Sequence, residues 1–455
     1  MKWIEFSKEL GCNCIFLYCQ KEKTMTEHLK KTLSPLLLWG LGVGYVISGM
    51  YFGWNLGLEK GGTWGMAGAT LLIIVFYSCF SFSYCELACA IPKAGGGFDY
   101  ANKAFGKNLG FITGLSQIIE FVFAPPAIAI AIGAYLHLSF PQIPVLHTAI
   151  VAYFIFTALN ISGVKIAATF ELVITIFAVV ELLIFAGITL PQFDIVHFKS
   201  DTGFKGVESV FAAIPFAIWF FLGIEGVANV AEETANPQKD ILKGFGSALF
   251  TLIVLCVITF IAAIGVGGWE KIVFNEDGSS SDSPLPMAMA LIVSKDSVLY
   301  HLLISIGLFG LVASFHGLIL ASGRATLEFG RVGFAPKFLG KIHPRFNTPA
   351  IALVANMCVG ILALLTGKTS EIITMAVMGA VVLYILSTAS LIKLRSTAPD
   401  MPRPFRVPLY PLTPYLALAI GIVCLIALVV YNPIIAAIFF GFLGLSFGVF
   451  KMVGR

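Results

Sequence analysis

Two glycine-rich segments interrupt long apolar runs, and each could place polar backbone groups inside a membrane. The first is Val46-Ile47-Ser48-Gly49-Met50, and the second is Phe220-Phe221-Leu222-Gly223-Ile224-Glu225-Gly226. An interrupted membrane helix leaves N–H and C=O groups that lipid cannot satisfy, so such segments persist only where they line a cavity or bind something. Matched interruptions in the two halves of a chain are typical of a transporter's binding site near the middle of the bilayer.

Charged residues within apolar runs are costly in lipid, so each one is a candidate for function. Glu120 precedes the Pro125-Pro126 pair, which cannot donate to the carbonyl groups of Phe121 and Val122. An acid and two free acceptors would therefore lie together, although a packing role for Glu120 is equally open. Glu225 lies within the second interruption, where a helix start offers N–H groups to anions and freed carbonyls attract cations. A binding role is favoured for Glu225.

Three further ionisable residues lie in apolar runs. His316 could titrate near neutral pH and carry a proton, or it could be tied to a backbone carbonyl for packing alone. Glu171 and Glu181 are ten residues apart on one predicted helix and nearly on opposite sides of it, so we expect one of them to face the helix bundle. Either could be a structural acid, and Glu181 is also a candidate for binding a coupling ion.

Aromatic residues crowd both interruptions: Tyr51, Phe52, Trp54, Trp219, Phe220 and Phe221. Aromatic ring faces attract ammonium groups by cation–π interaction. We therefore predict that the substrate lies between the two interruptions. The candidate substrate-binding residues are Ser48, Gly49, Met50, Glu120, Phe121, Phe220, Phe221, Gly223, Glu225 and His316.

The composition is that of a polytopic membrane protein. The 455 residues are 58% hydrophobic and 12% charged, whereas soluble domains carry roughly 25% charged residues. Because the net charge is only +4 and the nine cysteines form no CxxC pair, we expect no nucleic-acid partner, no metal and no cofactor.

Runs of about 20 apolar residues can cross a membrane. Twelve spans are predicted, at 36–58, 66–91, 109–136, 145–163, 166–190, 207–231, 242–268, 298–322, 349–366, 371–392, 411–431 and 433–450.

The positive charges are distributed unequally between alternate loops. The loops on one side hold only Lys60, Lys199, Lys205, Lys271, Lys295 and Lys368, so the other 23 of the 29 Lys and Arg residues lie on the side of the N-terminus. Cytoplasmic loops are enriched in Lys and Arg. We therefore expect both termini in the cytoplasm and the chain in the plasma membrane, in contact with the lipid bilayer.

Several short motifs occur in a characteristic order along the chain. Span 2 ends in Cys85-Glu86-Leu87, and the loop that follows reads Ile91-Pro92-Lys93-Ala94-Gly95-Gly96-Gly97. Further motifs are Glu232-Glu233, Asn236-Pro237, Arg324, Arg331–Pro336, Thr348-Pro349 and Arg403–Pro408. Together these motifs resemble the signature of the amino acid–polyamine–organocation superfamily over residues 32 to 410.

Within that superfamily the chain is most similar to bacterial ethanolamine permeases. The similar stretches are Val46–Gly49 with Tyr51–Trp54, Glu120–Ala127, Ala212–Phe221 and Gly307–Gly317. The resemblance implies an all-α fold of the LeuT type, in which spans 1–5 and 6–10 form an inverted repeat with helices 1 and 6 broken. It also implies alternating access driven by an ion gradient.

Two departures from that pattern concern the substrate and the coupling ion. Members of the ethanolamine group are expected to carry an acid where this chain has Met50. Some proton-coupled relatives carry a span-5 lysine in place of a sodium ion, and that position is Ala178 here. Ser314 could supply one hydroxyl to a sodium site between spans 1 and 8. The coupling ion, H⁺ or Na⁺, is therefore open.

The sequence favours an ion-driven permease that imports a small amine, most of all ethanolamine. One alternative is an amino-acid permease that holds a carboxylate on the backbone amides of Ser48, Gly49 and Met50. An alternative from another class is a nutrient sensor without net transport. No enzyme site is evident, and we expect a monomer or homodimer.

The chain is expected to divide into three parts. We expect residues 1–31 to form a cytoplasmic segment, of which residues 1–24 are dispensable. Residues 32–396 are expected to form the transporter core, and residues 397–455 are expected to form spans 11 and 12 with a short cytoplasmic C-terminus.

Overall fold

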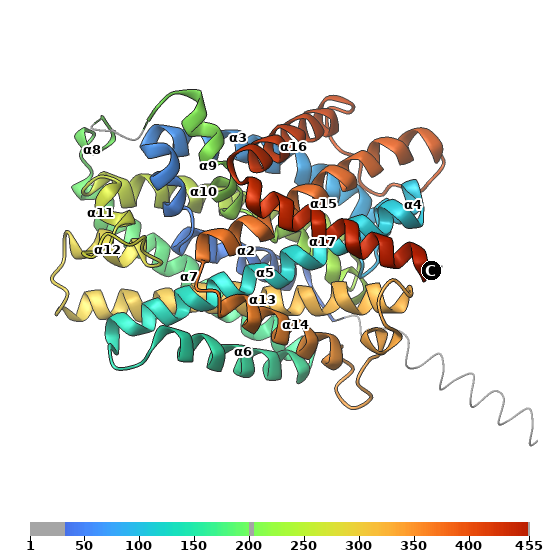
Figure 1. Ribbon diagram of the computed structural model, residues 1–455, viewed down its shortest axis with the longest axis horizontal. Coiled ribbons are helices and arrows are strands. Elements are labelled where there is room, and N and C mark those ends of the chain that lie inside the picture. The colour runs from blue at the N-terminus through green and yellow to red at the C-terminus, as the bar shows by residue number, and fades with distance from the viewer. Residues whose placement is uncertain (1–31, 200–203, 454–455) are drawn as a thin grey trace, which may run out of the picture.

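The computed structural model describes residues 32–199 and 204–453, and this part of the chain consists of helices without named strands (Figure 1). The predicted dispensable segment 1–24 lies outside the described residues. The main helices are α2 (Pro35–Tyr51), α3 (Asn55–Ala90), α4 (Gly97–Phe105), α5 (Lys107–Ser139), α6 (Val145–Ile161), α7 (Val164–Thr189), α9 (Val207–Trp219), α10 (Pro237–Gly265), α13 (Val298–Arg331), α14 (Ala350–Leu364), α15 (Thr369–Thr397), α16 (Leu412–Tyr431) and α17 (Pro433–Met452). Short helices are η1 (Leu190–Gln192), α8 (Val196–Lys199), η2 (Ile224–Glu233), α11 (Glu270–Val273), α12 (Pro284–Ala290) and η3 (Lys337–Gly340).

Most of the predicted spans correspond to one long apolar helix each. Within the described residues, nine helices are long and apolar enough to cross a membrane. Three shorter apolar helices, α2, α6 and α14, occupy the positions of the other three predicted spans. The described part of the chain is therefore a multi-pass helical bundle.

The first interruption lies one turn later than predicted. Residues 46–50 are helical, α2 continues to Tyr51, and the chain is non-helical at 52–54 before α3 begins. Gly53 adopts a φ of 88°, a left-handed conformation that glycine tolerates, and its N–H donates to Asn55 Oδ1 at 2.9 Å. The prediction of an interruption at Val46–Met50, within one span to residue 58, was wrong, because Gly49 is accommodated in the helix and Gly53 ends it.

The second interruption lies where it was predicted. Helix α9 ends at Trp219, and the 3-10 helix η2 begins at Ile224. Gly223 between them has a φ of 94°, in the left-handed region. The two interruptions also touch, since a Cβ added to Gly49 would lie 2.5 Å from the backbone oxygen of Trp219.

The helices around the two interruptions form the centre of the bundle. Helix α2 packs against α7, α10 and α13, while α3 packs along α9 and α5 packs against α13 and α15. Helices α16 and α17 lie at the periphery (Figure 1) and expose large apolar side chains, among them Ile434 (73% exposed) and Leu445 (76%). An exposed apolar surface of this kind suits contact with lipid rather than water.

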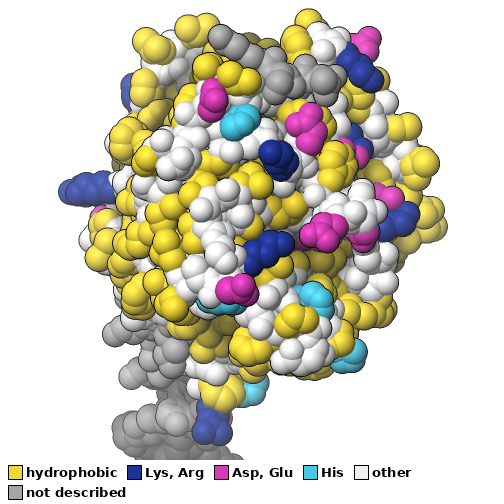
Figure 2. Space-filling view, turned by 90° about the vertical axis from the view of Figure 1, so that its left-hand side faces the viewer, with side chains coloured by type: hydrophobic (Ala, Val, Ile, Leu, Met, Phe, Trp, Pro, Cys, Tyr) yellow, Lys and Arg dark blue, Asp and Glu magenta, His cyan; other side chains and the backbone are white. Residues whose placement is uncertain are grey.

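The two ends of the bundle differ from its sides. Helices α11 and α12 lie at the end opposite to α4 and the C-terminus (Figure 1). Figure 2 views the molecule from the side of α11 and α12, and acidic, basic and histidine side chains are scattered there, while apolar side chains dominate the margins. The loop 269–297 thus lies at the end of the bundle opposite to the C-terminus. This is expected, because five predicted spans, an odd number, separate the two.

At the end that carries α4, the glycine-rich loop after α3 is tied to η2. The Asn229 side chain donates to the carbonyl of Ala94 at 2.7 Å and accepts from Gln117 Nε2 at 3.0 Å. The chain before α2 is tied to the same element, since Leu33 N–H donates to the Glu233 carbonyl at 2.9 Å. The motifs that flank the two interrupted helices are therefore connected at one end of the bundle.

We expect Gly49→Ala to destabilise the protein, because the added methyl group would clash with the Trp219 backbone. Backbone atoms cannot shift as easily as the end of a flexible side chain. Overpacking of this kind typically costs about 1–3 kcal/mol. Gly441→Ala, in α17 with no atom within 4 Å of the added Cβ, is the matched control. Thermal unfolding in detergent should give a lower midpoint for Gly49→Ala only; equal midpoints would contradict the contact between the two interruptions.

A second prediction concerns Asp99 in α4. Burial raises the pKa of Asp99 to about 7, the Glu328 carboxylate acts in the same direction, and the Lys93 ammonium group and the Gly95 N–H oppose them. Because this pKa lies above the unfolded value of about 3.9, the native state binds more protons between the two values. The free energy of unfolding therefore falls as the pH rises from about 4 to about 7 and stays low above it.

Replacing Asp99 by Asn removes this titration, so the variant should unfold at a higher temperature than the native protein at pH 8, and its advantage should shrink at pH 5. Asp400→Asn, at an exposed position, is the control and should change neither midpoint. A difference between Asp99→Asn and the native protein that is the same at both pH values would refute the assignment.

Candidate functional site

Two tryptophans satisfy backbone groups at the interruptions. Trp219 Nε1 donates to the Phe52 carbonyl and Trp54 Nε1 donates to the Met50 carbonyl, both at 3.1 Å. The Trp54 ring also stacks on Phe220, with 5.6 Å between the ring centroids. Both indoles are almost fully buried. Their N–H groups thus supply the donors that an interrupted helix lacks in lipid.

The hydroxyl of Ser314 joins α13 to α2. It donates to the Gly44 carbonyl at 2.6 Å and accepts from the Ser48 N–H at 2.8 Å. Gly44 and Ser48 are four residues apart, so these two groups are normal partners within a helix. The Ser314 hydroxyl therefore bonds with both ends of one helical hydrogen-bond pair beside the first interruption.

A pair of buried carboxyl groups lies beside the second interruption. The Tyr384 hydroxyl of α15 lies 2.8 Å from Glu225 Oε2 and 3.3 Å from Glu120 Oε1, and it is 3.1 Å from the Tyr77 hydroxyl. Both carboxyl groups therefore lie beside the same hydroxyl group. Helices α3, α5, α15 and η2 thus each contribute one polar group.

This carboxyl pair has no cationic partner among the described residues. Both acids are 0% exposed, and Glu120 Oε2 and Glu225 Oε1 accept no hydrogen bond. Two carboxylates at this separation repel each other in a low-dielectric interior. The cluster therefore requires a proton or a cation between the two groups.

His316 belongs to a different cluster. Its Nδ1 lies 2.7 Å from Glu171 Oε2 of α7, and both side chains are 0% exposed. His316 Nε2 and Glu171 Oε1 have no hydrogen-bond partner in the described part of the chain. His316 was predicted to lie near Glu120 and Glu225, whereas in the structure it pairs with Glu171, where α7 meets α13.

Glu181 lies farther along α7 and is also buried. Its Oε2 accepts a hydrogen bond from the Tyr51 hydroxyl at 2.6 Å. The prediction that only one of Glu171 and Glu181 faces the bundle was wrong, because ten residues at about 100° each leave the two side chains only about 80° apart around the helix. Both fit within one broad buried face of α7.

The other predicted site residues surround the carboxyl pair or the interruptions. Phe221 lies against Tyr77 with 5.2 Å between ring centroids, while Met50 and Phe121 are fully buried. Tyr77 and Tyr384 were not among the predicted site residues. A tyrosine in the middle of an apolar span is a signal that could have found them, since its buried hydroxyl usually requires a polar partner.

Comparison with known proteins agrees with this architecture. A family model described as amino acid permease matches residues 33–444. The chain is 27% identical to a methylthioribose transporter of Bacillus subtilis (strain 168), and the similar region covers 88% of each of the two chains. It is 25% identical to a branched-chain amino acid permease of the same organism, over 86% of each chain.

A third relative is a low-affinity putrescine importer of Escherichia coli (strain K12). It is 25% identical to this chain, over 75% of the chain and 76% of the importer. The family match covers most of the chain, and these three relatives are named as transporters of chemically different small molecules. The chain therefore belongs to the amino acid permease family of membrane transporters and is not an enzyme.

Proposed function

We propose that this protein is a secondary transporter that imports a small organic ammonium compound, most of all ethanolamine, by alternating access. In this proposal twelve helices cross the plasma membrane with both termini in the cytoplasm. The first ten form two inverted five-helix repeats, with interruptions after α2 and α9. The substrate lies between these interruptions, beside the Glu120–Glu225 pair.

The carboxyl pair is the observation that carries this proposal. Two buried acids that share the Tyr384 hydroxyl, each with one oxygen free of hydrogen bonds, form a strong acceptor site for a cation. An ammonium group carries donors only, and ethanolamine adds one hydroxyl that can donate or accept. The nearby Tyr77 hydroxyl and the Phe221 ring add a polar and an aromatic contact.

The backbone near the first interruption supports an amine over a carboxylate. Ser48 N–H, which a substrate carboxylate would need, already donates to Ser314, and α2 remains helical past Met50. One of the protein's own groups therefore occupies the anion-binding position at the first interruption. One relative is named for import of putrescine, which is also an amine.

The second candidate is a permease for zwitterionic amino acids. Met50 favours it, because a thioether is only a weak acceptor and cannot neutralise an ammonium group. Another relative is named as a branched-chain amino acid permease. In that case Glu120 or Glu225 would meet the amino group, and the substrate carboxylate would have to displace an existing backbone contact.

The coupling ion in this proposal is the proton. The Ser314 hydroxyl is already bonded to Gly44 and Ser48, so it contributes less to a sodium site than an unbonded hydroxyl would. The Glu171–His316 pair provides a buried group that can take up and release a proton. Uptake driven by an inward proton gradient in sodium-free buffer is the expected behaviour.

Replacing Glu225 by Gln removes one carboxylate with little change in volume. We expect uptake of labelled ethanolamine into proteoliposomes to fall at least about tenfold at low substrate concentration, equivalent to about 1.4 kcal/mol of binding free energy. Glu371→Gln, at a half-exposed position on α15, is the control and should transport normally. Unchanged uptake by Glu225→Gln would show that Glu225 is structural.

The substrate class is tested with Met50→Glu. We expect the native protein to take up ethanolamine in preference to leucine, and the new acid to weaken leucine uptake further by repelling its carboxylate. If instead the native protein transports leucine but not ethanolamine, and Met50→Glu reverses that preference, the proposed substrate is wrong. Absence of uptake of both compounds would favour the sensor without net transport.

A further inference from the structure

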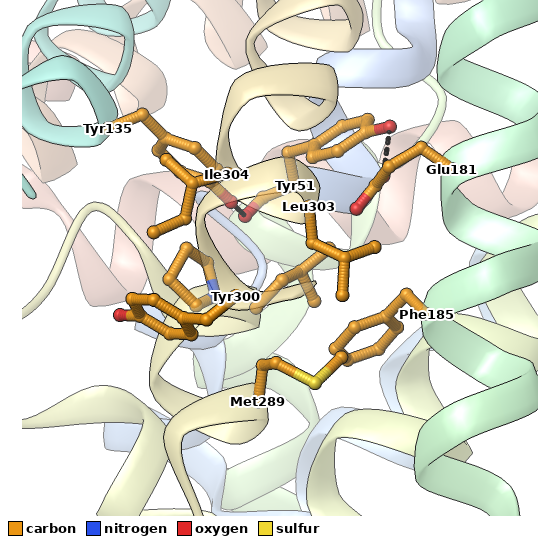
Figure 3. A pocket seen from close by; sticks show the side chains of 10 residues that line it. Tyr51, Tyr135, Glu181, Phe185, Met289, Tyr300, Leu303 and Ile304 are labelled. Carbon is orange, nitrogen blue, oxygen red and sulfur yellow. Dashed lines mark hydrogen bonds between the residues drawn. The ribbon is translucent and has the colours of Figure 1, made fainter. Parts of the chain in front are cut away.

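A cavity beside the first interruption combines one carboxyl group with several aromatic rings. It is lined by Tyr51, Tyr135, Glu181, Phe185, Met289 and Tyr300, together with four aliphatic or proline side chains (Figure 3). It lies beside α12 at the end of the bundle predicted to face outward. None of its lining residues belongs to the Glu120–Glu225 pair.

Glu181 is the only acid in this lining, and no cation among the described residues pairs with it. The side chain is 3% exposed, and none of the ion pairs of the described residues includes it. The Tyr51 hydroxyl bonds with one carboxylate oxygen, and Figure 3 shows the other oxygen directed toward the centre of the cavity. A buried carboxyl group with a free oxygen is expected to be matched by a proton or by a cation.

Aromatic rings line the same cavity, and Tyr51 and Tyr135 are held in place by their mutual contacts. Tyr51 and Tyr135 meet edge to face with 6.5 Å between centroids, and the Tyr135 hydroxyl donates to the Tyr51 carbonyl at 3.1 Å. Gly310 of α13 leaves room for the Tyr51 ring, which would clash with any added Cβ there. Tyr300 and Phe185 line other parts of the wall (Figure 3). Aromatic faces around a cation are a recurring way to bind organic ammonium groups.

The dimensions of the cavity suit a small group. The cavity measures about 250 Å³ when the part open to solvent is included, and the space wide enough for water holds about one molecule. An ammonium group is similar in size to water and fits such a space, whereas a large side chain does not. Leu285, Pro286 and Met289 form one wall, and they belong to the short helix α12.

We propose that this cavity is a second binding site for the ammonium group of a small organic cation, with Glu181 as the counter-ion and Tyr51, Tyr135 and Tyr300 as the aromatic wall. The proposal rests on the proposed function, because it places an ammonium site on the outer side of the same transporter. Tyr51 is the last residue of α2, so this site adjoins the first interruption. A substrate entering from outside would meet it before the central carboxyl pair.

The test is binding of labelled methylammonium to the purified full-length protein by equilibrium dialysis. The measurements use the Glu225→Gln background, in which the central pair is weakened. We expect Glu181→Gln and Tyr300→Leu each to weaken this binding at least about tenfold. A loss of affinity of this size is expected when a charged or cation–π contact is removed. Tyr300→Phe retains the ring and should bind normally, which separates a lost aromatic contact from misfolding. Glu371→Gln and Tyr415→Leu are the controls for the two substitutions.

Binding that is unchanged in both Glu181→Gln and Tyr300→Leu would overturn the second site, whatever the transport assays show. Displacement of methylammonium by sodium but not by potassium would also overturn it, because it would identify a sodium site at Glu181. Methylammonium binding that depends on Glu181, without ethanolamine uptake by the native protein, would support the second site and contradict the proposed function. The two proposals can therefore fail independently.

Discussion

The requirement that buried backbone groups find partners inside the protein governs the centre of this structure. Lipid offers no hydrogen bonds, so each polar group released by a helix interruption must be met by the chain itself. Trp54 and Trp219 donate to carbonyls beside the first interruption, and the Ser314 hydroxyl bonds with a carbonyl and an N–H of α2. These contacts hold α2, α9 and α13 in one arrangement.

The buried acids fall into three clusters with different partners. Glu120 and Glu225 share a tyrosine hydroxyl, Glu171 pairs with a histidine, and Glu181 accepts from Tyr51 and faces aromatic rings. A carboxyl group in a low-dielectric interior is stable only when neutralised or paired with a cation. Our proposals give the clusters different tasks: substrate binding for the first, proton exchange for the second and capture of an ammonium group for the third.

Local sequence was sufficient for some features and insufficient for others. Gly223 and the adjoining aromatic run identified the second interruption, because a glycine followed by an acid is a strong signal within an otherwise apolar helix. The first interruption was placed a turn early, since Gly49 packs against Trp219 in a continuous helix and Gly53 takes the left-handed conformation instead. Nothing local distinguishes these two glycines. The distinction depends on Trp219 and Ser314, which are distant in sequence.

The acids show the same limit. Their presence within spans marked them as candidates, but their partners come from other helices and no spacing rule predicts them. The Tyr384 hydroxyl contacts both Glu120 and Glu225, although the three residues are far apart in the sequence. His316 contacts Glu171, which is also distant along the chain. The pattern of apolar runs predicted the helices well because it is a property of each helix alone. The composition of each polar cluster depends on how the helices pack.

The most direct test of the central claim is an experimental structure of the protein with ethanolamine bound. The account predicts density between the two interruptions, with the ligand nitrogen about 2.7–3.2 Å from a carboxylate oxygen of Glu120 or Glu225. Ligand bound away from both acids would contradict it. A zwitterionic ligand with its carboxylate on the backbone of Ser48, Gly49 and Met50, bound in preference to ethanolamine, would contradict it as well.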